Sequence, residues 1–234
     1  KEVSVGFVNS ASSVAKKCTK CLSCMKIAIV HKKVSLTGGA ERYMRNLAVL
    51  FAKQGFNVSV YAGRCDLADT PDVFFNKVRI IPFPPFLKIL SFAVNSKRAL
   101  QKEKYDLIAG MGNVFDQDLH FLGGGIYKSY VRASLLRYKT FFGKLQRHIR
   151  RLLSPSHWLK LFIEKKIFES ELTKFFICSS RIVENDLKSI YKIDGSKIRI
   201  IRNGIDTERF NPYDRDEARK KLIQMCKFNN ADFV

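Results

Sequence analysis

Residues 26–62 read KIAIVHKKVSLTGGAERYMRNLAVLFAKQGFNVSVYA and carry the clearest structural pattern in the chain. Residues 26–30 form a short apolar run rich in β-branched side chains, which is typical of a buried strand. After Gly38 and Gly39, apolar side chains recur three and four positions apart, which predicts a helix that ends at Gly55. Residues 56–62 then alternate like a second strand. This order predicts a right-handed parallel crossover.

The two glycines between strand and helix are the first candidates for chemistry. Without Cβ atoms, Gly38 and Gly39 let backbone N–H groups approach an anion at the positive end of the helix, which contributes roughly 0.3 to 2 kcal/mol. A tight turn that binds nothing explains the same residues. No G-x-G-x-x-G follows the strand and no G-x-x-x-x-G-K-S/T occurs in the chain. The sequence therefore disfavours a nicotinamide dehydrogenase and a Walker-type ATPase.

Composition points to a globular protein with an anionic partner. The chain has 234 residues, 46% of them hydrophobic, which is enough for one domain or one and a fraction. Lys and Arg number 42 against 21 for Asp and Glu, and the net charge of +21 suits nucleic acid, an acidic membrane or a phosphorylated substrate. No apolar run reaches the roughly 18 residues of a membrane span, and residues 1–17 lack the apolar core of a signal peptide. We therefore expect a cytoplasmic protein.

Three cysteines near the start form the pattern Cys18-x-x-Cys21-x-x-Cys24, which would suit part of a metal or iron–sulfur site. No fourth ligand stands nearby, so we expect no metal. Residues 1–24 do not belong to the strand and helix pattern, and Met25 directly precedes the first strand. We expect residues 1–24 to be an extension of uncertain status.

The remainder of the chain continues the α/β pattern. We expect strands at 78–81, 105–110, 119–122, 174–178 and 198–201, and helices at 87–102, from Ser180 towards Tyr191, and at 213–227. This alternation predicts a Rossmann-like parallel sheet with helices on both faces.

Polar residues follow the predicted strand at 105–110. They include Asn113, Asp116, Asp118 and His120. In open parallel sheets ligands gather at the carboxyl ends of the strands, so we expect this group to share one edge, and one cleft, with Gly38 and Gly39. Residues 116–118 have the D-x-D form of a metal motif, but the form recurs in a polar segment at 214–216 and is weak evidence. Taken alone, His120 is more typical of a satisfied structural histidine than of a functional group.

Residues 128–166 contain 11 Lys and Arg and a single acid, Glu164. Apolar residues from Leu135 to Leu152 recur three and four apart, and basic residues flank them. Three interpretations compete: a core-facing helix with a solvated basic face, a helix on an anionic membrane surface, and a nucleic-acid site. Near an acidic leaflet each basic side chain contributes on the order of 1 kcal/mol. The predicted membrane or acceptor surface comprises Phe141, Phe142, Lys144, Arg147, Arg150 and Arg151. Nucleic acid is the least supported partner, because no RNP, zinc-finger or helix-turn-helix signature is present.

Five segments of the chain together resemble the amino-terminal half of glycosyltransferase family 4. They are MKIAIV, TGGAE, YDLIAG, SSRIVENDL and IRIIRNGIDTERFNP. The resemblance spans residues 25 to about 212, and its most specific part is NGIDTERFNP. Within the family, GGAERYMRNLA and DQDLHFLGGGIYKSY are most similar to the glucosyltransferases of the lipopolysaccharide core.

The resemblance implies a GT-B fold, in which two Rossmann-like domains face each other across a cleft. It implies a metal-independent, retaining transfer of a hexosyl group, glucose from UDP-glucose in the first instance, to a phosphorylated lipopolysaccharide-core or lipid-linked acceptor at the inner membrane face. By position, Gly38 and Gly39 would approach the donor pyrophosphate. Asp118 would orient or deprotonate the acceptor hydroxyl, with His120 as the substitute. Asn203 and Gly204 would form the interdomain hinge.

The same resemblance assigns residues 25–205 to the acceptor-side domain and residues 206–234 to the start of a second domain. Family members hold the nucleotide mainly through that second domain, with an Arg/Lys pair and a Glu-x7-Glu motif that these residues do not include. We therefore expect the chain alone neither to bind a nucleotide sugar tightly nor to transfer sugar. The competing hypothesis is a non-catalytic basic α/β module that binds anionic membrane or nucleic acid.

Overall fold

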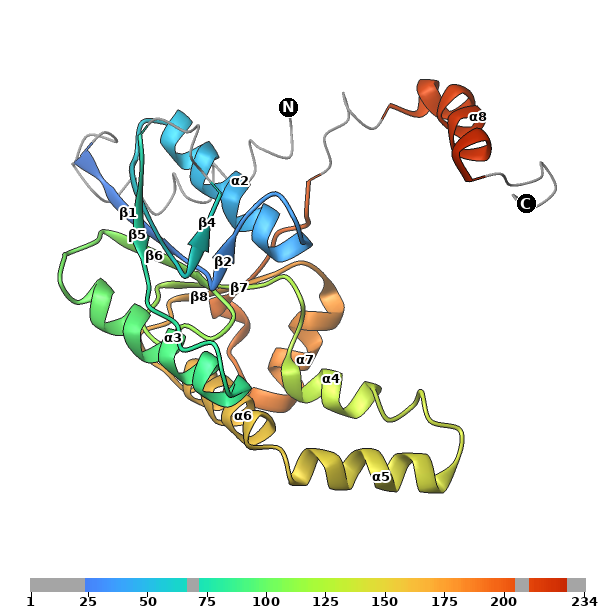
Figure 1. Cartoon of the computed structure of the whole chain (residues 1–234). Helices are drawn as coiled ribbons and strands as arrows, with labels where there is room; N and C mark the ends of the chain where they lie inside the picture. Colours follow the sequence, from blue (N-terminus) through green and yellow to red (C-terminus); the bar gives the residue numbers. More distant parts are fainter. Residues whose placement is uncertain (1–23, 67–71, 205–210, 227–234) are drawn as a thin grey trace. The chain divides into compact units, whose positions relative to one another are not determined.

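The computed structural model describes residues 24–66, 72–204 and 211–226 (Figure 1). The chain divides into two compact units, residues 13–202 and residues 1–12 with 203–234. Apart from Cys24, the predicted extension lies outside the described residues. The assignment of residues 25–205 and 206–234 to two domains stays a prediction.

A seven-stranded parallel sheet with the order β5-β3-β1-β6-β7-β8-β9 forms the centre of the unit of residues 13–202. Its strands are β1 (Lys26–Val30), β3 (Asn57–Ala62), β5 (Val73–Lys77), β6 (Leu107–Met111), β7 (Leu119–Leu122), β8 (Phe175–Cys178) and β9 (Ile198–Ile200). A second, two-stranded sheet pairs β2 (Lys33–Val34) with β4 (Arg64–Cys65).

Helices cover both faces of the large sheet. Helix α2 (Gly39–Lys53) lies on one face, and α3 (Pro85–Leu100) and α6 (Pro155–Phe168) lie together on the other (Figure 1). Ala28 and Val30 of β1 share a core cluster with Phe92 of α3. Helix α7 (Arg181–Tyr191) packs against β8 and β9, and η2 (Gly195–Lys197) precedes β9. The predicted Rossmann-like α/β fold is confirmed.

The crossover from β1 through α2 to β3 forms as predicted. The two strands are parallel, with Ile27 beside Val58. Met44 and Phe51 of α2 are buried, as the three-and-four spacing requires. Gly55 has a φ of 85° and its N–H donates to the Ala52 carbonyl at 2.9 Å, so this glycine ends the helix.

The edge strand differs from the prediction. The strand predicted at 78–81 does not form, and the edge strand is instead β5, which ends at Lys77. The Val78 N–H still donates to the Ala62 carbonyl of β3 at 2.9 Å, and beyond it the Ile81 N–H donates to the Ser91 hydroxyl of α3 at 3.0 Å. Strand β5 itself lies at the edge with Phe74 and Phe75 exposed, so it lacks the alternation that marks a half-buried strand.

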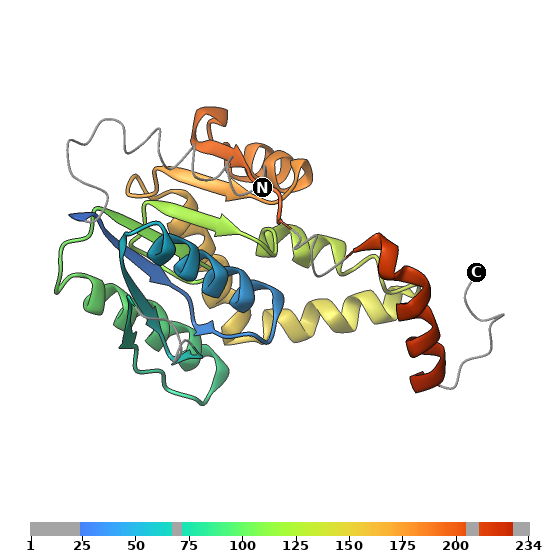
Figure 2. The same cartoon turned by 90° about the horizontal axis from the view of Figure 1, so that it is seen from above.

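Two helices, α4 (Tyr127–Ala133) and α5 (Phe141–Leu152), form an arm that projects from the sheet (Figures 1 and 2). The apolar spacing had suggested one helix from Leu135 to Leu152. Instead Thr140 caps α5, because its hydroxyl accepts a hydrogen bond from the Gly143 N–H at 3.2 Å. Helix α6 then begins at Pro155, a residue whose fixed φ suits the first position of a helix.

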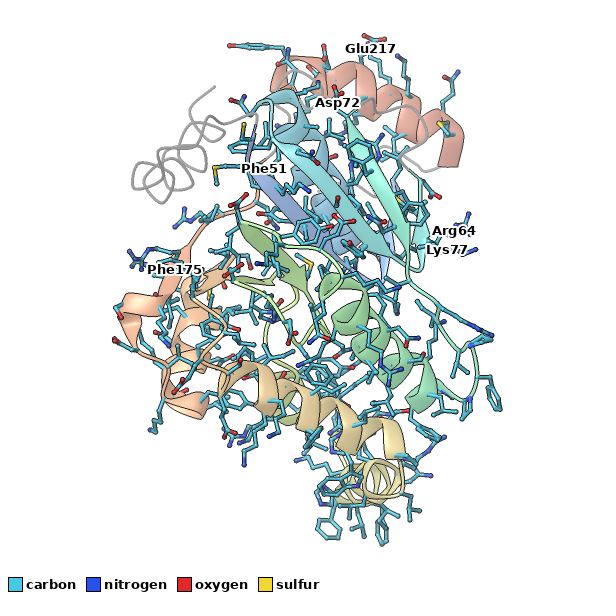
Figure 3. All side chains as sticks on the ribbon, turned by 90° about the vertical axis from the view of Figure 1, so that its left-hand side faces the viewer. Phe51, Arg64, Asp72, Lys77, Phe175 and Glu217 are labelled. Atoms are coloured by element: carbon cyan, nitrogen blue, oxygen red, sulfur yellow. The ribbon has the colours of Figure 1, made fainter. Side chains whose placement is uncertain are left out.

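The other unit contains η3 (Pro212–Asp214) and α8 (Arg215–Cys226), and α8 lies within the helix predicted at 213–227. Glu217, labelled in Figure 3, forms an ion pair with Lys221 one turn later, with 2.7 Å between Oε1 and Nζ. Both side chains are exposed, so the pair contributes little to stability.

Candidate functional site

A cavity of about 340 Å³ lies at the carboxyl edge of the sheet, between the start of α2, the ends of β6 and β7, and the helices α4 and α6. We call it the edge cavity. His31, Ala40, Asn113, Tyr127 and Lys160 are among the polar and small residues of its wall. Its place agrees with the expectation that ligands of parallel sheets bind beyond the carboxyl ends of the strands.

The glycine turn borders this cavity. Gly38 has a φ of 92° and precedes α2, and no side chain caps the helix. A Cβ atom on Gly39 would meet nothing within 4 Å, and Ala40, the next residue, lines the edge cavity. The start of α2 is therefore open beside Gly39, whereas the Glu41 carboxylate lies close to Gly38. Uncapped N–H groups at the start of a helix can bind an anion. That Gly38 and Gly39 approach a donor phosphate stays a prediction.

The structure brings only some of the polar residues that were expected at one edge to the edge cavity. Asn113 and His120 line the edge cavity. Asp116 instead forms an ion pair with Lys97 of α3, with 3.1 Å between Oδ1 and Nζ.

Asp118 lies at the amino end of β7, and its predicted position in the cleft is wrong. Its Oδ2 accepts a hydrogen bond from the Ile108 N–H at 2.8 Å, and its Oδ1 lies 2.8 Å from Lys174 Nζ. Strand β7 runs from this point towards the edge cavity, whose wall includes His120, two residues further along the chain, but not Asp118. The carboxylate ties the amino ends of β6, β7 and β8 together.

His120 lies inside β7 and is poorly suited to remove a proton. The Gln117 amide nitrogen donates to its Nδ1 at 2.8 Å and also to the Val114 carbonyl at 3.0 Å. Nδ1 therefore accepts, and Nε2 carries the proton of the neutral ring. Burial, with Phe168 and Phe176 against the ring, lowers the pKa of His120 to about 4. At neutral pH the ring is a hydrogen-bond donor.

We expect His120 to make the folded state sensitive to acid. Because its folded-state pKa lies below the unfolded value of about 6.5, its contribution is present above pH 6.5 and is lost as the pH falls towards 4. The loss amounts to roughly 2 kcal/mol by pH 4.5. Urea unfolding of His120→Gln and of the natural protein at pH 7 and 4.5 measures it. An equal loss in both proteins would show that other groups cause it.

His31 is the functional candidate that the sequence analysis missed. It directly follows β1 and lines the edge cavity. Its Nδ1 lies 3.0 Å from the Met111 carbonyl, which can only accept, so Nδ1 carries the proton and Nε2 has a free lone pair. Burial lowers the pKa of His31, which keeps the ring neutral near pH 7. The signal was a titratable residue immediately after a buried strand.

Glu164 of α6 holds the first turn of α4 in place. Its carboxylate accepts hydrogen bonds from the Tyr127 N–H, from the Lys128 N–H at 3.0 Å and from the Tyr191 hydroxyl at 2.7 Å. Burial and this carboxylate raise the pKa of Tyr191. Glu164 also lines the edge cavity, so the single acid of the basic segment organises its wall.

The apolar side chains of helix α5 are exposed. We call these exposed residues the apolar face of α5: Phe141, Phe142, Leu145, Ile149 and Leu152. Phe141 is 74% exposed and Phe142 is 81% exposed. The interpretation as a core-facing helix is therefore wrong for the unit of residues 13–202. Arg151 is instead the buried residue of the helix.

The other predictions concern the cysteine pattern, a metal site and the interdomain hinge. Cys18 and Cys21 lie outside them, and Cys24 is exposed. Within residues 24–66, 72–204 and 211–226, no three His, Cys, Asp or Glu side chains gather as a metal site would require. Asn203 and Gly204 follow β9 where one unit gives way to the other, and their role as a hinge stays a prediction.

A parallel sheet with helices on both faces and a cavity at its carboxyl edge defines a Rossmann-like ligand-binding domain. The model of Glycosyltransferase Family 4 matches residues 37–209, and the chain belongs to this family. Comparison with curated proteins gave no significant match.

Three solved structures show the same fold. WaaG, a glycosyltransferase involved in lipopolysaccharide biosynthesis, is 18% identical with a TM-score of 0.66, over 84% of this chain and 51% of WaaG. A glycosyltransferase from Rickettsia africae is 18% identical with a TM-score of 0.52, over 88% of this chain and 50% of that one. Sucrose-phosphate synthase from Thermosynechococcus elongatus is 20% identical with a TM-score of 0.56, over 85% and 52%. The chain spans about half of each and has the fold of the amino-terminal half of a GT-B glycosyltransferase.

Proposed function

We propose that this chain forms the acceptor side of a retaining glycosyltransferase. The enzyme moves a hexosyl group, in the first instance glucose from UDP-glucose, to a lipopolysaccharide-core or other lipid-linked acceptor. The observation that carries the proposal is the edge cavity, which borders the uncapped start of α2 and has residues of α4 in its wall. The description of WaaG as an enzyme of lipopolysaccharide biosynthesis supports this acceptor class.

In this proposal the start of α2 binds the donor and His31 binds the acceptor. The first N–H groups of α2 face the phosphates of the donor and stabilise the charge that develops on the leaving group. His31, with its free Nε2, accepts a hydrogen bond from the acceptor hydroxyl and orients it for attack. His31 takes the role that we had assigned to Asp118 and His120.

The apolar face of α5 places the enzyme on the membrane. An amphipathic helix with exposed aromatic residues inserts into the region between headgroups and acyl chains. The net charge of +21 adds attraction to an anionic leaflet. No helix in the described ranges has the length and apolarity needed to cross a bilayer. An exposed apolar face disfavours the alternative of a nucleic-acid module, because nucleic acids present charged phosphates.

The test is transfer of radiolabelled glucose from UDP-glucose to extracted membrane glycolipids. The protein assayed is the chain with any sequence that its gene encodes on either side. We expect His31→Ala to lower kcat by at least tenfold through loss of orientation of the hydroxyl. His148→Ala is the matched control, because His148 is exposed on α5, and it should retain activity.

Asp118→Asn separates the two assignments of the catalytic centre. With the folded fraction measured by circular dichroism, activity per folded molecule should stay within about threefold of the natural protein. Loss of transfer at Asp118 with normal folding would restore its predicted role. Absence of transfer from every nucleotide sugar in a panel would overturn the proposed function.

A further inference from the structure

A second pocket, of about 290 Å³, lies within the arm between α4, α5 and the start of α6. We call it the arginine pocket. Its wall consists of Tyr127, Tyr130, Arg147, Arg150, Arg151, Ser154 and His157. Tyr127 and Tyr130 also line the edge cavity, so the two spaces adjoin.

Three guanidinium groups meet here without a neutralising acid. Arg151 is buried, and it donates to the Val131 carbonyl at 3.0 Å and to the Ser134 hydroxyl. The Nε of Arg147 is buried and has no hydrogen-bond partner. No ion pair between the described residues involves Arg147, Arg150 or Arg151. Arg147 is half-buried and Arg151 is buried, so their like charges have lost water and repel each other, and an anion in the pocket would relieve the repulsion.

The donor set suits a phosphate group. Guanidinium groups bind phosphate through paired hydrogen bonds, and several of them match its double negative charge. The Tyr127 hydroxyl lies 3.0 Å from His157 Nδ1 and adds polar groups to the wall. At about 290 Å³ the pocket has room for a phosphate and its nearest substituent.

The arginines and the apolar face lie on opposite sides of α5. At about 3.6 residues per turn, Arg147, Arg150 and Arg151 share one side, and Leu145, Ile149 and Leu152 point the other way. A helix is about 10 to 12 Å across with its side chains. When the apolar face enters the membrane, the arginine pocket therefore lies within reach of the headgroup layer.

We propose that the arginine pocket binds a phosphomonoester carried by the sugar acceptor, so that the adjoining sugar enters the edge cavity. This inference rests on the proposed function and adds a requirement for a phosphate on the acceptor. Of the two alternatives predicted for this surface, membrane or acceptor, it gives the acceptor role to Arg147, Arg150 and Arg151, which line a pocket on the side of α5 opposite the apolar face.

Calorimetry on the 234-residue chain tests the pocket without any transfer reaction. The probe is glucose 6-phosphate, and glucose is the uncharged reference. We expect glucose 6-phosphate to bind at least tenfold more tightly than glucose, and Arg147→Gln and Arg150→Gln each to weaken its binding at least tenfold. Lys144→Gln removes the same charge from the same helix outside the pocket and should change binding less than twofold. Arg151 is left intact because it supports α4.

Two results would overturn the inference: glucose 6-phosphate that binds no better than glucose, or Lys144→Gln that weakens binding as much as the arginine substitutions. Folding is verified by circular dichroism, and the exposed Arg150 provides a variant with little risk to the fold. Competition with vesicles distinguishes the phosphate source. Phosphatidic acid, a monoester, competes if the pocket also takes lipid headgroups, whereas phosphatidylglycerol at equal charge does not. Because binding is measured directly, failure of sugar transfer leaves this result intact.

Discussion

Replacing Glu164 with alanine is expected to lower the free energy of unfolding by about 3 to 5 kcal/mol. The substitution removes the acceptor of the Tyr127 and Lys128 N–H groups and of the Tyr191 hydroxyl. Hydrogen bonds to a charged group are worth about 1.5 to 3 kcal/mol each, and they are not fully additive. The negative carboxylate also interacts favourably with the positive amino-terminal end of α4, and the substitution removes this interaction. Urea denaturation at pH 7, followed by circular dichroism, measures the loss.

Glu169→Ala is the matched control for this prediction. Glu169 ends the same helix, and its only ion pair is a surface contact with Lys165 at 3.7 Å among the interactions of the described residues. Its removal should cost less than about 0.5 kcal/mol. A loss below about 1 kcal/mol at Glu164 would show that α4 keeps its place without this carboxylate. Since α4 walls both the edge cavity and the arginine pocket, we expect the Glu164 variant to lose sugar transfer as well.

The double substitution Phe141→Glu and Phe142→Glu is expected to lower binding to anionic vesicles by at least 100-fold. Both rings are largely exposed, so the substitutions have little effect on the folded protein. Burying one phenylalanine contributes about 1.5 to 3 kcal/mol, and each 1.4 kcal/mol is a factor of about ten. The two glutamates add repulsion from the leaflet. Sedimentation with vesicles of phosphatidylcholine and phosphatidylglycerol measures the partition coefficient.

Phe83→Glu controls for a general effect of removing an exposed aromatic ring. Phe83 is 78% exposed and lies before α3, outside the arm. Its replacement should leave vesicle binding within about twofold of the natural protein. Unchanged binding of the double variant would contradict insertion of the apolar face and leave charge alone to account for membrane attraction. Binding would then vanish at high salt, because exposed charges are screened.

The crossover around α2 was predictable from its residues. The apolar spacing, the glycine turn and Gly55 act over a few positions, and each specifies a local backbone shape. The family was also predictable, because segments such as NGIDTERFNP are specific short patterns. The match to residues 37–209 and the parallel sheet confirm both.

The orientation of α5 could not be predicted in the same way. A stripe from Phe142 to Leu152 gives the same pattern whether it packs on a core or remains exposed. The outcome depends on what the fold places opposite the stripe. In the unit of residues 13–202, α4 and α6 pack beside the arginine side of α5, and the stripe is left exposed.

For the edge cavity, too, the sequence predicted some features, and only the tertiary structure placed the others. Local sequence identified the large sheet's strands other than the edge strand β5, the glycine turn and a family of sugar transferases, because these depend on neighbouring residues. It placed Asp118 in the cleft and overlooked His31, because the level of each residue in a sheet depends on the register between strands. Pairing of Ala109 with Leu119 puts Asp118 beside Ile108 at the amino edge. The end of β1 beside β6 puts His31 against Met111 in the cavity wall, and that register comes from long-range packing.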